Sequence, residues 1–107
     1  MTYSVAYSRR AVRQLQELHD YIAHQGSPLA AMSFVGSIFD DCDRFDVFPG
    51  RGVPRDDLRQ GMRVVGFQRQ ATILIRVDEA TKRVIILGVY YGGQDYEAAL
   101  KSTYDDE

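Results

Sequence analysis

The stretch that decides the fold is Met62 to Tyr91, MRVVGFQRQATILIRVDEATKRVIILGVYY. It contains three runs rich in valine, isoleucine and leucine, a composition typical of β-strands. The polar segments QRQ and DEATK separate the runs, and connections of this length join antiparallel strands as hairpins. The sequence therefore predicts a three-stranded antiparallel meander over residues 62–67, 71–77 and 83–91.

The predicted strands differ in how their two faces are exposed. Side chains alternate along the middle run, so Ile73, Ile75 and Val77 should share one face of the sheet. The last run, 83–91, is apolar on both faces, which is typical of a strand in the interior of a sheet. We therefore expect this run to lie between other strands.

Two helices are predicted upstream of the meander. A short strand-like run at 3–7 is followed by Ser8, a suitable N-cap, and by apolar residues that recur every three or four positions from Ala11 to Ile22. Gly26 suits the left-handed position past the end of this helix. Ser27 and the proline after it then start a second helix, and so short a connection folds the two helices back into an antiparallel hairpin.

The second predicted helix is more apolar than one buried stripe requires. Its apolar residues form two stripes, the second of which consists of Leu29, Met32, Gly36 and Phe39. The first stripe consists of Ala31, Val35, Ile38, Cys42 and Phe45. The second stripe predicts either a wider face that is buried in the core or a docking face for a partner chain.

The remaining segments complete the predicted architecture. Residues 48–54, FPGRGVP, contain two prolines and two glycines and should be irregular. A short helix or a frayed tail is expected at 95–104, after a hinge at Gly92 and Gly93 where glycine permits a positive φ. The predicted order is β-αα-βββ-(α), an α+β fold in which a helical hairpin packs on one face of an antiparallel sheet.

Composition excludes several classes of protein. The chain has 107 residues and a net charge of −2, as expected of one globular domain spanning 1–107. It has no apolar run of 18 residues, and its start, MTYSVAYSRR, is unlike a signal peptide. A single cysteine cannot form an internal disulfide, so we expect a cytoplasmic protein without a membrane segment.

Charge is unevenly distributed along the chain. The segment Arg51–Arg83 contains eight basic and four acidic residues, whereas acidic residues dominate 40–46 and 95–107. A basic middle can provide a polar binding face. The isoelectric point of about 5.6, however, makes direct binding to nucleic acid unlikely, because such binding needs a strong positive excess.

No catalytic, cofactor or metal site is predicted. His19 and His24 lack a suitably placed nucleophile and carboxylate, and the cysteine falls on a buried stripe, where a thiol is inert. The acidic cluster DDCDRFD lacks the glycine and alternating ligands of a calcium loop, so we interpret it as a solvated helix end. The glycine pair at 92–93 is followed by neither lysine nor a hydroxyl side chain, which excludes a phosphate cradle.

The strands carry a set of arginines and tyrosines that form a candidate binding surface. These residues are Arg63, Arg76, Arg83, Tyr90 and Tyr91. Alternation can bring some of them together on the face away from the helices, where they would hold phosphates or an acidic protein segment. The same residues also fit ordinary solvent-side charge on an antiparallel sheet.

Four segments in order carry a resemblance to a known family. They are DYIAHQGSPLAA, FPGRGVPRDDLRQGMRVV, a β-hairpin and VYYGGQDYEAAL, together covering roughly residues 3–100. In this series the chain resembles the ParE toxins of bacterial type II toxin–antitoxin modules, which belong to the RelE/ParE superfamily and include plasmid stabilisation proteins. The resemblance implies a strand, a helical hairpin and an antiparallel sheet.

The resemblance also implies a function. It implies a cytoplasmic growth inhibitor that poisons DNA gyrase without chemistry of its own and is silenced by a ParD-like antitoxin in a hetero-oligomer. We expect the antitoxin to cover Leu29, Met32 and Phe39. The candidate contacts with the target are Arg63, Arg76, Arg83, Tyr90, Tyr91, Asp95 and Tyr96.

The RelE branch of the superfamily provides the alternative function. RelE toxins resemble this chain in fold but cut messenger RNA on the ribosome, with basic residues around the sheet. This chain has only two lysines, Lys82 and Lys101, and its histidines lie in its first quarter. We therefore favour the gyrase function and keep a ribosome-dependent endoribonuclease as the alternative.

Overall fold

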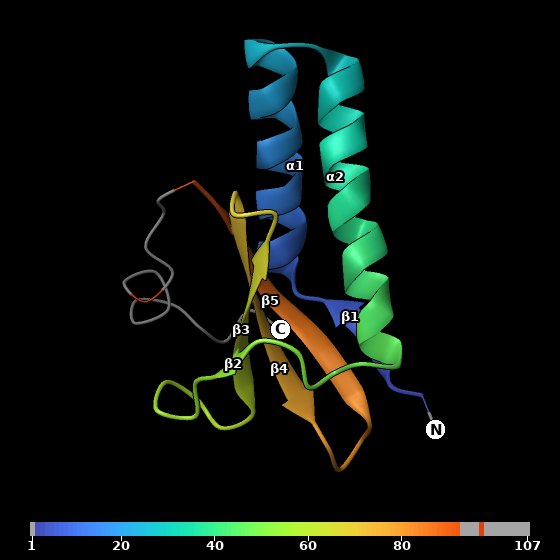
Figure 1. The fold of residues 1–107 in the computed structure, drawn as a ribbon, viewed down its shortest axis with the longest axis vertical. Coiled ribbons are helices and arrows are strands. Elements are labelled where there is room, and N and C mark those ends of the chain that lie inside the picture. The colour runs from blue at the N-terminus through green and yellow to red at the C-terminus, as the bar shows by residue number, and fades with distance from the viewer. Residues whose placement is uncertain (1, 93–96, 98–107) are drawn as a thin grey trace.

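The computed structural model describes residues 2–92 and residue 97 (Figure 1). Two helices lie on one face of a five-stranded sheet, which confirms the predicted α+β class. The predicted helix at 95–104 falls outside the described residues except at one position. In chain order the elements are β1 (Ser4–Tyr7), α1 (Arg9–Gln25), α2 (Pro28–Asp43), the 3-10 helix η1 (Arg44–Asp46), β2 (Val53–Pro54), β3 (Met62–Phe67), β4 (Ala71–Asp78) and β5 (Arg83–Tyr91).

The sheet has the strand order β1-β5-β4-β3-β2. The antiparallel meander of β3, β4 and β5 is confirmed, and β5 lies between β1 and β4 as its two apolar faces predicted. The prediction of a wholly antiparallel sheet is wrong at one edge, because β1 pairs with β5 in parallel, with Tyr7 opposite Ile86. Parallel neighbours require a long crossover, and the helical hairpin provides its first part.

Local capping explains where the helices begin. The Ser8 hydroxyl accepts a hydrogen bond from the Ala11 N–H at 3.0 Å and donates one to the Leu87 carbonyl at 2.9 Å. One buried side chain therefore starts α1 and ties it to β5. Ser27 caps α2 in the same way. Gly26 ends α1 as predicted, but its φ of −131° is not left-handed, because the chain passes directly into the extended Ser27.

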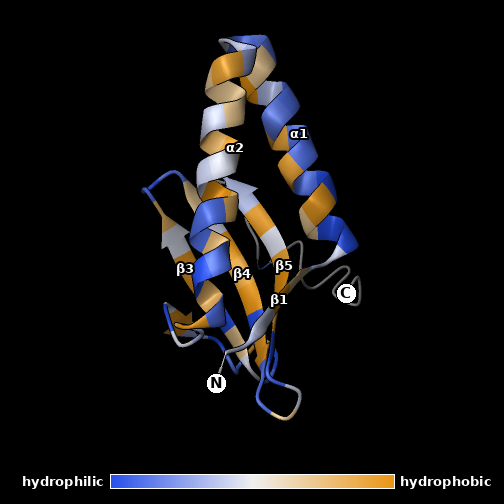
Figure 2. Ribbon diagram, turned by 90° about the vertical axis from the view of Figure 1, so that its right-hand side faces the viewer, coloured by the Kyte–Doolittle hydropathy of each residue, from blue (hydrophilic) through white to orange (hydrophobic). Residues whose placement is uncertain are grey.

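The main core lies between the helices and the sheet. The α1 stripe, apart from the partly buried Ile22, and the first stripe predicted for the second helix are buried here. Apolar residues also concentrate along β4 and β5 (Figure 2). Ile73 and Ile75 face this core together with the partly buried Val77, as alternation predicted. Neither α1 nor α2, nor any other helix in the described part of the chain, is long and apolar enough to cross a bilayer.

A second, smaller core covers the opposite face of the sheet, which we call the far face. It contains Met62, Leu74, Ile85, Leu87 and Tyr90, with Leu58 and Val64 packed against it. Leu58 belongs to the segment 55–61, which precedes β3. This segment therefore packs over the far face, and the centre of the sheet is buried on both sides.

A bulge in β5 sets the direction of its last side chains. Leu74 lies opposite Gly88 but Ile75 lies opposite Ile86, so Leu87 is an extra residue in β5. Beyond the bulge Val89 joins the core under the helices, whereas Tyr90 joins the far face. Strict alternation from Ile86 would have placed these two side chains the other way round.

The loop between α2 and β3 contains a short strand and is held to α2 by Arg51. Residues 53 and 54 were expected to be irregular, but they form the short edge strand β2, with Val53 opposite Val64. The Arg51 guanidinium lies 4.3 Å from the Phe45 ring centroid and pairs with Asp41 at 3.0 Å between Nη1 and Oδ1. Asp41 is therefore partly buried in an ion pair, and the prediction of a fully solvated acidic helix end is wrong at this residue.

Candidate functional site

The far face brings together two of the arginines predicted for target binding. Arg76 lies opposite Ile85, and Arg83 lies opposite Asp78 at the start of β5. Alternation places both arginines on the side of Ile85. Arg76 is half-buried and Arg83 is exposed. Hydrogen bonds from Thr81, and more weakly the Arg76 charge, lower the pKa of the Asp78 carboxyl, so it is anionic beside them.

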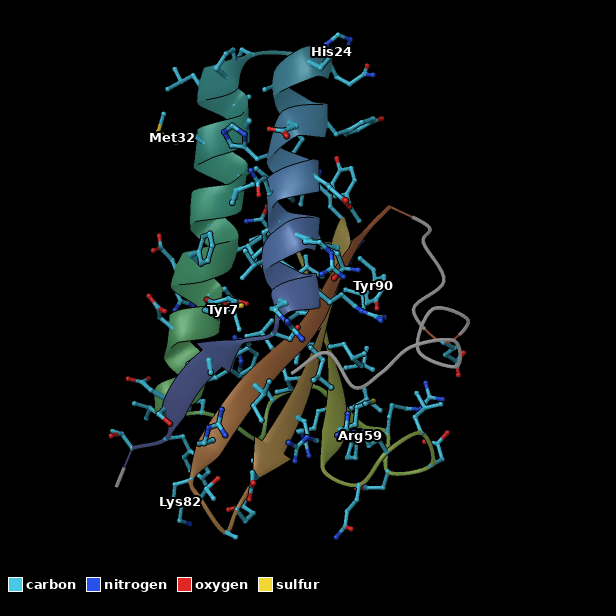
Figure 3. All side chains as sticks on the ribbon, turned by 180° about the vertical axis from the view of Figure 1, so that it is seen from behind. Tyr7, His24, Met32, Arg59, Lys82 and Tyr90 are labelled. Carbon is cyan, nitrogen blue, oxygen red and sulfur yellow. The ribbon has the colours of Figure 1, made fainter. Side chains whose placement is uncertain are left out.

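Tyr90 lies in the floor of this surface rather than on its rim (Figure 3). The side chain is 3% exposed and packs with the apolar residues of the far face. A Cβ atom at Gly88 would lie 2.7 Å from Cε1 of this ring. The bulge and the missing side chain at Gly88 therefore position Tyr90 together.

Arg63 is separated from the other predicted contacts. Its neighbours Met62 and Val64 belong to the far face, so alternation directs Arg63 to the opposite side. Nε donates to the Arg51 carbonyl at 2.8 Å, and Nη2 donates to the carbonyls of Gly50 at 2.7 Å and Gly52 at 3.1 Å. These bonds hold the loop before β2 against the sheet edge, which is a structural role.

Tyr91 is also separated from Tyr90, because it faces the helices. Its ring packs on Tyr21 with centroids 6.3 Å apart, and edge-on against Phe34 at 5.7 Å. It lines a groove between α1 and the end of β5. The last two predicted contacts, Asp95 and Tyr96, lie outside the described residues.

Two arginines at the rim of the far face were missed by the sequence interpretation. Arg55 and Arg59 belong to the same segment as Leu58, whose side chain packs on the far-face core; Figure 3 labels Arg59. Arg55 holds Asp57 through two bonds of 3.0 Å and Glu97 through one of 2.7 Å, and its hydrogen bond lowers the pKa of Asp57. The basic excess of the segment Arg51–Arg83 indicated that such arginines were present. It could not indicate that they lie near the sheet, because that depends on the conformation of the loop.

The second apolar stripe of α2 is exposed to solvent. Leu29 is 73%, Met32 63% and Phe39 41% exposed, so the alternative of a wider buried face is wrong. Phe39 rests on the Tyr7 ring at a centroid distance of 5.3 Å. A Cβ atom at Gly36, between them, would meet no atom within 4 Å. We call these four α2 residues the α2 stripe; its apolar row has a shallow gap at the glycine.

The buried thiol and phenol near α2 are not poised for chemistry. Burial raises the pKa of Cys42 to about 12, and burial followed by the nearby Cys42 and Asp43 raises the pKa of Tyr7. A thiol that stays protonated is a poor nucleophile and a poor metal ligand. No group of three or more histidine, cysteine, aspartate or glutamate residues within the described ranges could hold a metal ion.

The geometry supports binding through surface complementarity. The far face has an apolar floor and a rim of guanidinium groups, which can form paired hydrogen bonds to carboxylates or phosphates. Both histidines lie on α1, on the other side of the sheet. An anionic protein or nucleoprotein surface is therefore the kind of partner that this face fits best.

Comparison with known proteins found one matching family model and several similar solved structures. The family model described as the ParE toxin of the type II toxin–antitoxin system parDE matches residues 5–96. No curated protein matches the chain significantly. The chromosomal ParDE system of P. aeruginosa is similar in structure, with a TM-score of 0.71, 21% identity, and coverage of 84% of this chain and 96% of that one.

Two further solved structures share the fold. One is the RelBE2 toxin–antitoxin complex of Mycobacterium tuberculosis, with a TM-score of 0.52, 23% identity, and coverage of 85% of this chain and 99% of that one. The other is a double mutant of E. coli RelE in the free state, with a TM-score of 0.67, 12% identity, and coverage of 92% and 93%. At these identities the likeness shows the fold alone.

Proposed function

The chain belongs to the ParE toxin family of type II toxin–antitoxin systems, and from this we propose that it arrests growth by binding and poisoning DNA gyrase. The match over residues 5–96 is the observation that carries the proposal. The described surface is consistent with it, because the far face offers guanidinium groups over an apolar floor. Inhibition would then come from surface fit and not from proton transfer by the toxin.

The far face is the proposed contact with gyrase. Arg76 and Arg83 lie on it, and Arg59 belongs to the segment that packs over it, whereas Arg55 is engaged with Asp57 and Glu97. A guanidinium group binds a carboxylate or phosphate through two parallel hydrogen bonds, so a cluster of arginines can recognise an acidic protein segment or a strand of the gyrase–DNA complex. Tyr90 would support this surface from below.

The α2 stripe is the proposed docking face for a ParD-like antitoxin. Three large apolar side chains are exposed along one side of a helix, which is an arrangement that helical partners cover. Burying each of them fully would contribute about 1.5–3 kcal/mol before the cost of ordering the partner. A partner that folds on binding can bury such a surface and still be released when it is degraded.

Two experiments test the proposed function in sequence. Induction of the toxin should arrest growth, and co-expression of the protein encoded by the adjacent reading frame should restore it. The purified toxin should then inhibit supercoiling by gyrase and stabilise cleaved DNA. The double variant R76A/R83A should lose most of this inhibition, whereas Arg44→Ala, which removes an exposed arginine of η1, should retain it. Gyrase activity unchanged by the wild-type toxin would overturn the proposal.

One observation favours the ribonuclease as a second candidate. A reduced RelE-like site would combine Arg63, Arg76, Arg83 and Tyr90, and three of these four, all but Arg63, share the far face. The Tyr90 side chain is 3% exposed, however, which limits its access to an RNA substrate. Mapping of 5′ ends on translated messages after induction distinguishes the two functions. New ends at defined codon positions would establish cleavage.

A further inference from the structure

A preformed groove opens between α1 and the end of β5, away from both surfaces assigned above. Its volume is about 440 Å³. The described lining consists of Gln14, Glu17, Leu18, Tyr21, Val89, Tyr91 and Gly92. The α1 residues are spaced three or four positions apart and therefore share one side of the helix. A side chain entering here would contact one helix and one strand.

The walls of the groove are held in place by contacts of their own. The Gln14 side chain accepts a hydrogen bond from the Val89 N–H at 2.8 Å, which joins the helix to the strand across the groove floor. The Tyr91 ring is fixed between Tyr21 and Phe34, at centroid distances of 6.3 and 5.7 Å. Because these walls are already ordered, a ligand loses little affinity to rearrangement of the toxin.

The chemistry of the lining specifies the charge of the occupant. Glu17 is the one charged side chain among the described lining residues, and the Tyr21 and Tyr91 rings lie on the same groove. A carboxylate attracts a cation, and the face of a tyrosine ring also attracts one. Leu18 and Val89 add apolar surface that suits the methylene stem of a long basic side chain.

We propose that this groove anchors an arginine side chain of the antitoxin. The guanidinium group pairs with the Glu17 carboxylate and packs against the tyrosine rings, and its planar shape suits both contacts better than the ammonium group of lysine does. The inference rests on the proposed toxin–antitoxin function and names the chemistry of the partner. Figure 3 shows Met32 on the outer side of α2, so an antitoxin segment that covers both surfaces must pass around the helical hairpin.

The proposal is tested by a double-mutant cycle with the protein encoded by the adjacent reading frame. Each arginine and lysine of that protein is changed to methionine in turn, and Kd is measured by calorimetry against wild-type toxin and Glu17→Gln. We expect Glu17→Gln to weaken binding about fivefold, the range of an exposed ion pair. One arginine variant should weaken binding equally without adding to the effect of Glu17→Gln.

Variants of Tyr21 test the contribution of the ring, and a variant of Asp20 is the control for charge. Tyr21 is 54% exposed, so Tyr21→Ala should fold normally and weaken binding about tenfold, while Tyr21→Phe keeps the ring and should restore affinity. Asp20→Asn removes the same charge one turn along α1 without touching the groove and should leave Kd unchanged. An equal loss with Asp20→Asn would show a general charge effect and overturn the proposal.

The remaining outcomes separate the possible failures. If wild-type toxin does not bind the adjacent protein at all, the proposed function fails and this inference fails with it. If wild-type toxin binds but no arginine couples to Glu17, only the inference fails; coupling to a lysine alone refutes the preference for arginine. If Tyr21→Ala instead abolishes self-association of the toxin in sedimentation velocity, the occupant is a second copy of the chain and the proposal is wrong.

Discussion

Gly88→Ala should destabilise the toxin more than any other alanine change at a strand glycine. A Cβ atom at residue 88 would lie 2.7 Å from Cε1 of Tyr90, 3.0 Å from its hydroxyl oxygen and 3.0 Å from the Gln14 side-chain oxygen. Carbon atoms in contact prefer separations of about 3.5–4.0 Å, so the new methyl group would overlap the ring carbon by about 1 Å. The ring cannot simply swing away, because Tyr90 is 3% exposed and packed in the far-face core.

The expected cost follows from these contacts. Overpacking of this kind costs about 1–3 kcal/mol, and the reduced entropy of the unfolded chain returns about 0.4–1 kcal/mol of it. The midpoints of these ranges leave a net loss of about 1.3 kcal/mol, or a fall in Tm of roughly 5–10 °C for a domain of this size. Urea unfolding and thermal melting of the purified toxin, followed by circular dichroism, measure both quantities.

Gly66→Ala is the matched control, since it lies in β3 and a Cβ atom there would meet nothing within 4 Å. It should leave stability unchanged within about 0.5 kcal/mol or raise it slightly. A second test combines Gly88→Ala with Tyr90→Leu, which removes the ring atoms that the new methyl group meets. The cost of Gly88→Ala should shrink in that background. If Gly88→Ala and Gly66→Ala prove equally stable, the close approach is not what requires glycine at the bulge.

Three further predictions concern the loop clamp, the buried thiol and the α2 stripe. Arg63→Ala should lower the free energy of unfolding by about 1–3 kcal/mol, because three carbonyl groups lose a charged donor. Arg44→Ala should change it by less than about 0.5 kcal/mol. Equal effects of the two variants in urea titrations would contradict the stabilising role of the Arg63 hydrogen bonds. Because folding raises the pKa of Cys42 from 9.0 to about 12, its contribution to stability is present below pH 9 and is lost as the pH rises toward 12. The thiol alone should lower the free energy of unfolding there by at most about 1.4 kcal/mol per pH unit, and Tyr7, whose pKa is also raised, adds to the fall above pH 10. Cys42→Ala should flatten that slope, and an unchanged slope would show that the thiol is not responsible. Met32→Glu and Phe39→Glu should each abolish co-purification with the protein encoded by the adjacent reading frame, because both side chains are exposed on the α2 stripe. The melting temperature of each variant should stay near that of the wild type. Intact binding would place the docking face elsewhere, and the sheet edge would be tested next.

Several features of the fold were determined by local sequence patterns. The strand runs 62–67 and 83–91 match β3 and β5, and the middle run ends one residue short of β4. Ser8 and Ser27 cap the two helices as predicted, because a cap depends on side chains within one turn of the helix start. Gly92 leaves β5 with a φ of +67°, as expected of a glycine hinge.

The candidate site could be predicted only in part. Periodicity identified the α2 stripe but could not say whether it was buried, since that depends on what packs against the helix. Counting charges located the basic segment but not Arg55 and Arg59 at the far face, because a loop conformation brings them there. The glycine inside the last run was a signal for the bulge that the alternation argument did not use.

The sequence by itself determined β1, the two helices and the meander, together with their order, because caps, periodicity and turns act over a few residues. It also carried the resemblance to the family. Only the tertiary structure decided which side chains share a surface. One extra residue in β5 directs Tyr90 to the far face and Tyr91 to the helices, the reverse of what strict alternation would give. The register of β3 places Arg63 on the side away from Arg76 and Arg83, where carbonyl groups of a neighbouring loop hold it. Both outcomes depend on pairings between segments distant in the chain, which no local pattern encodes.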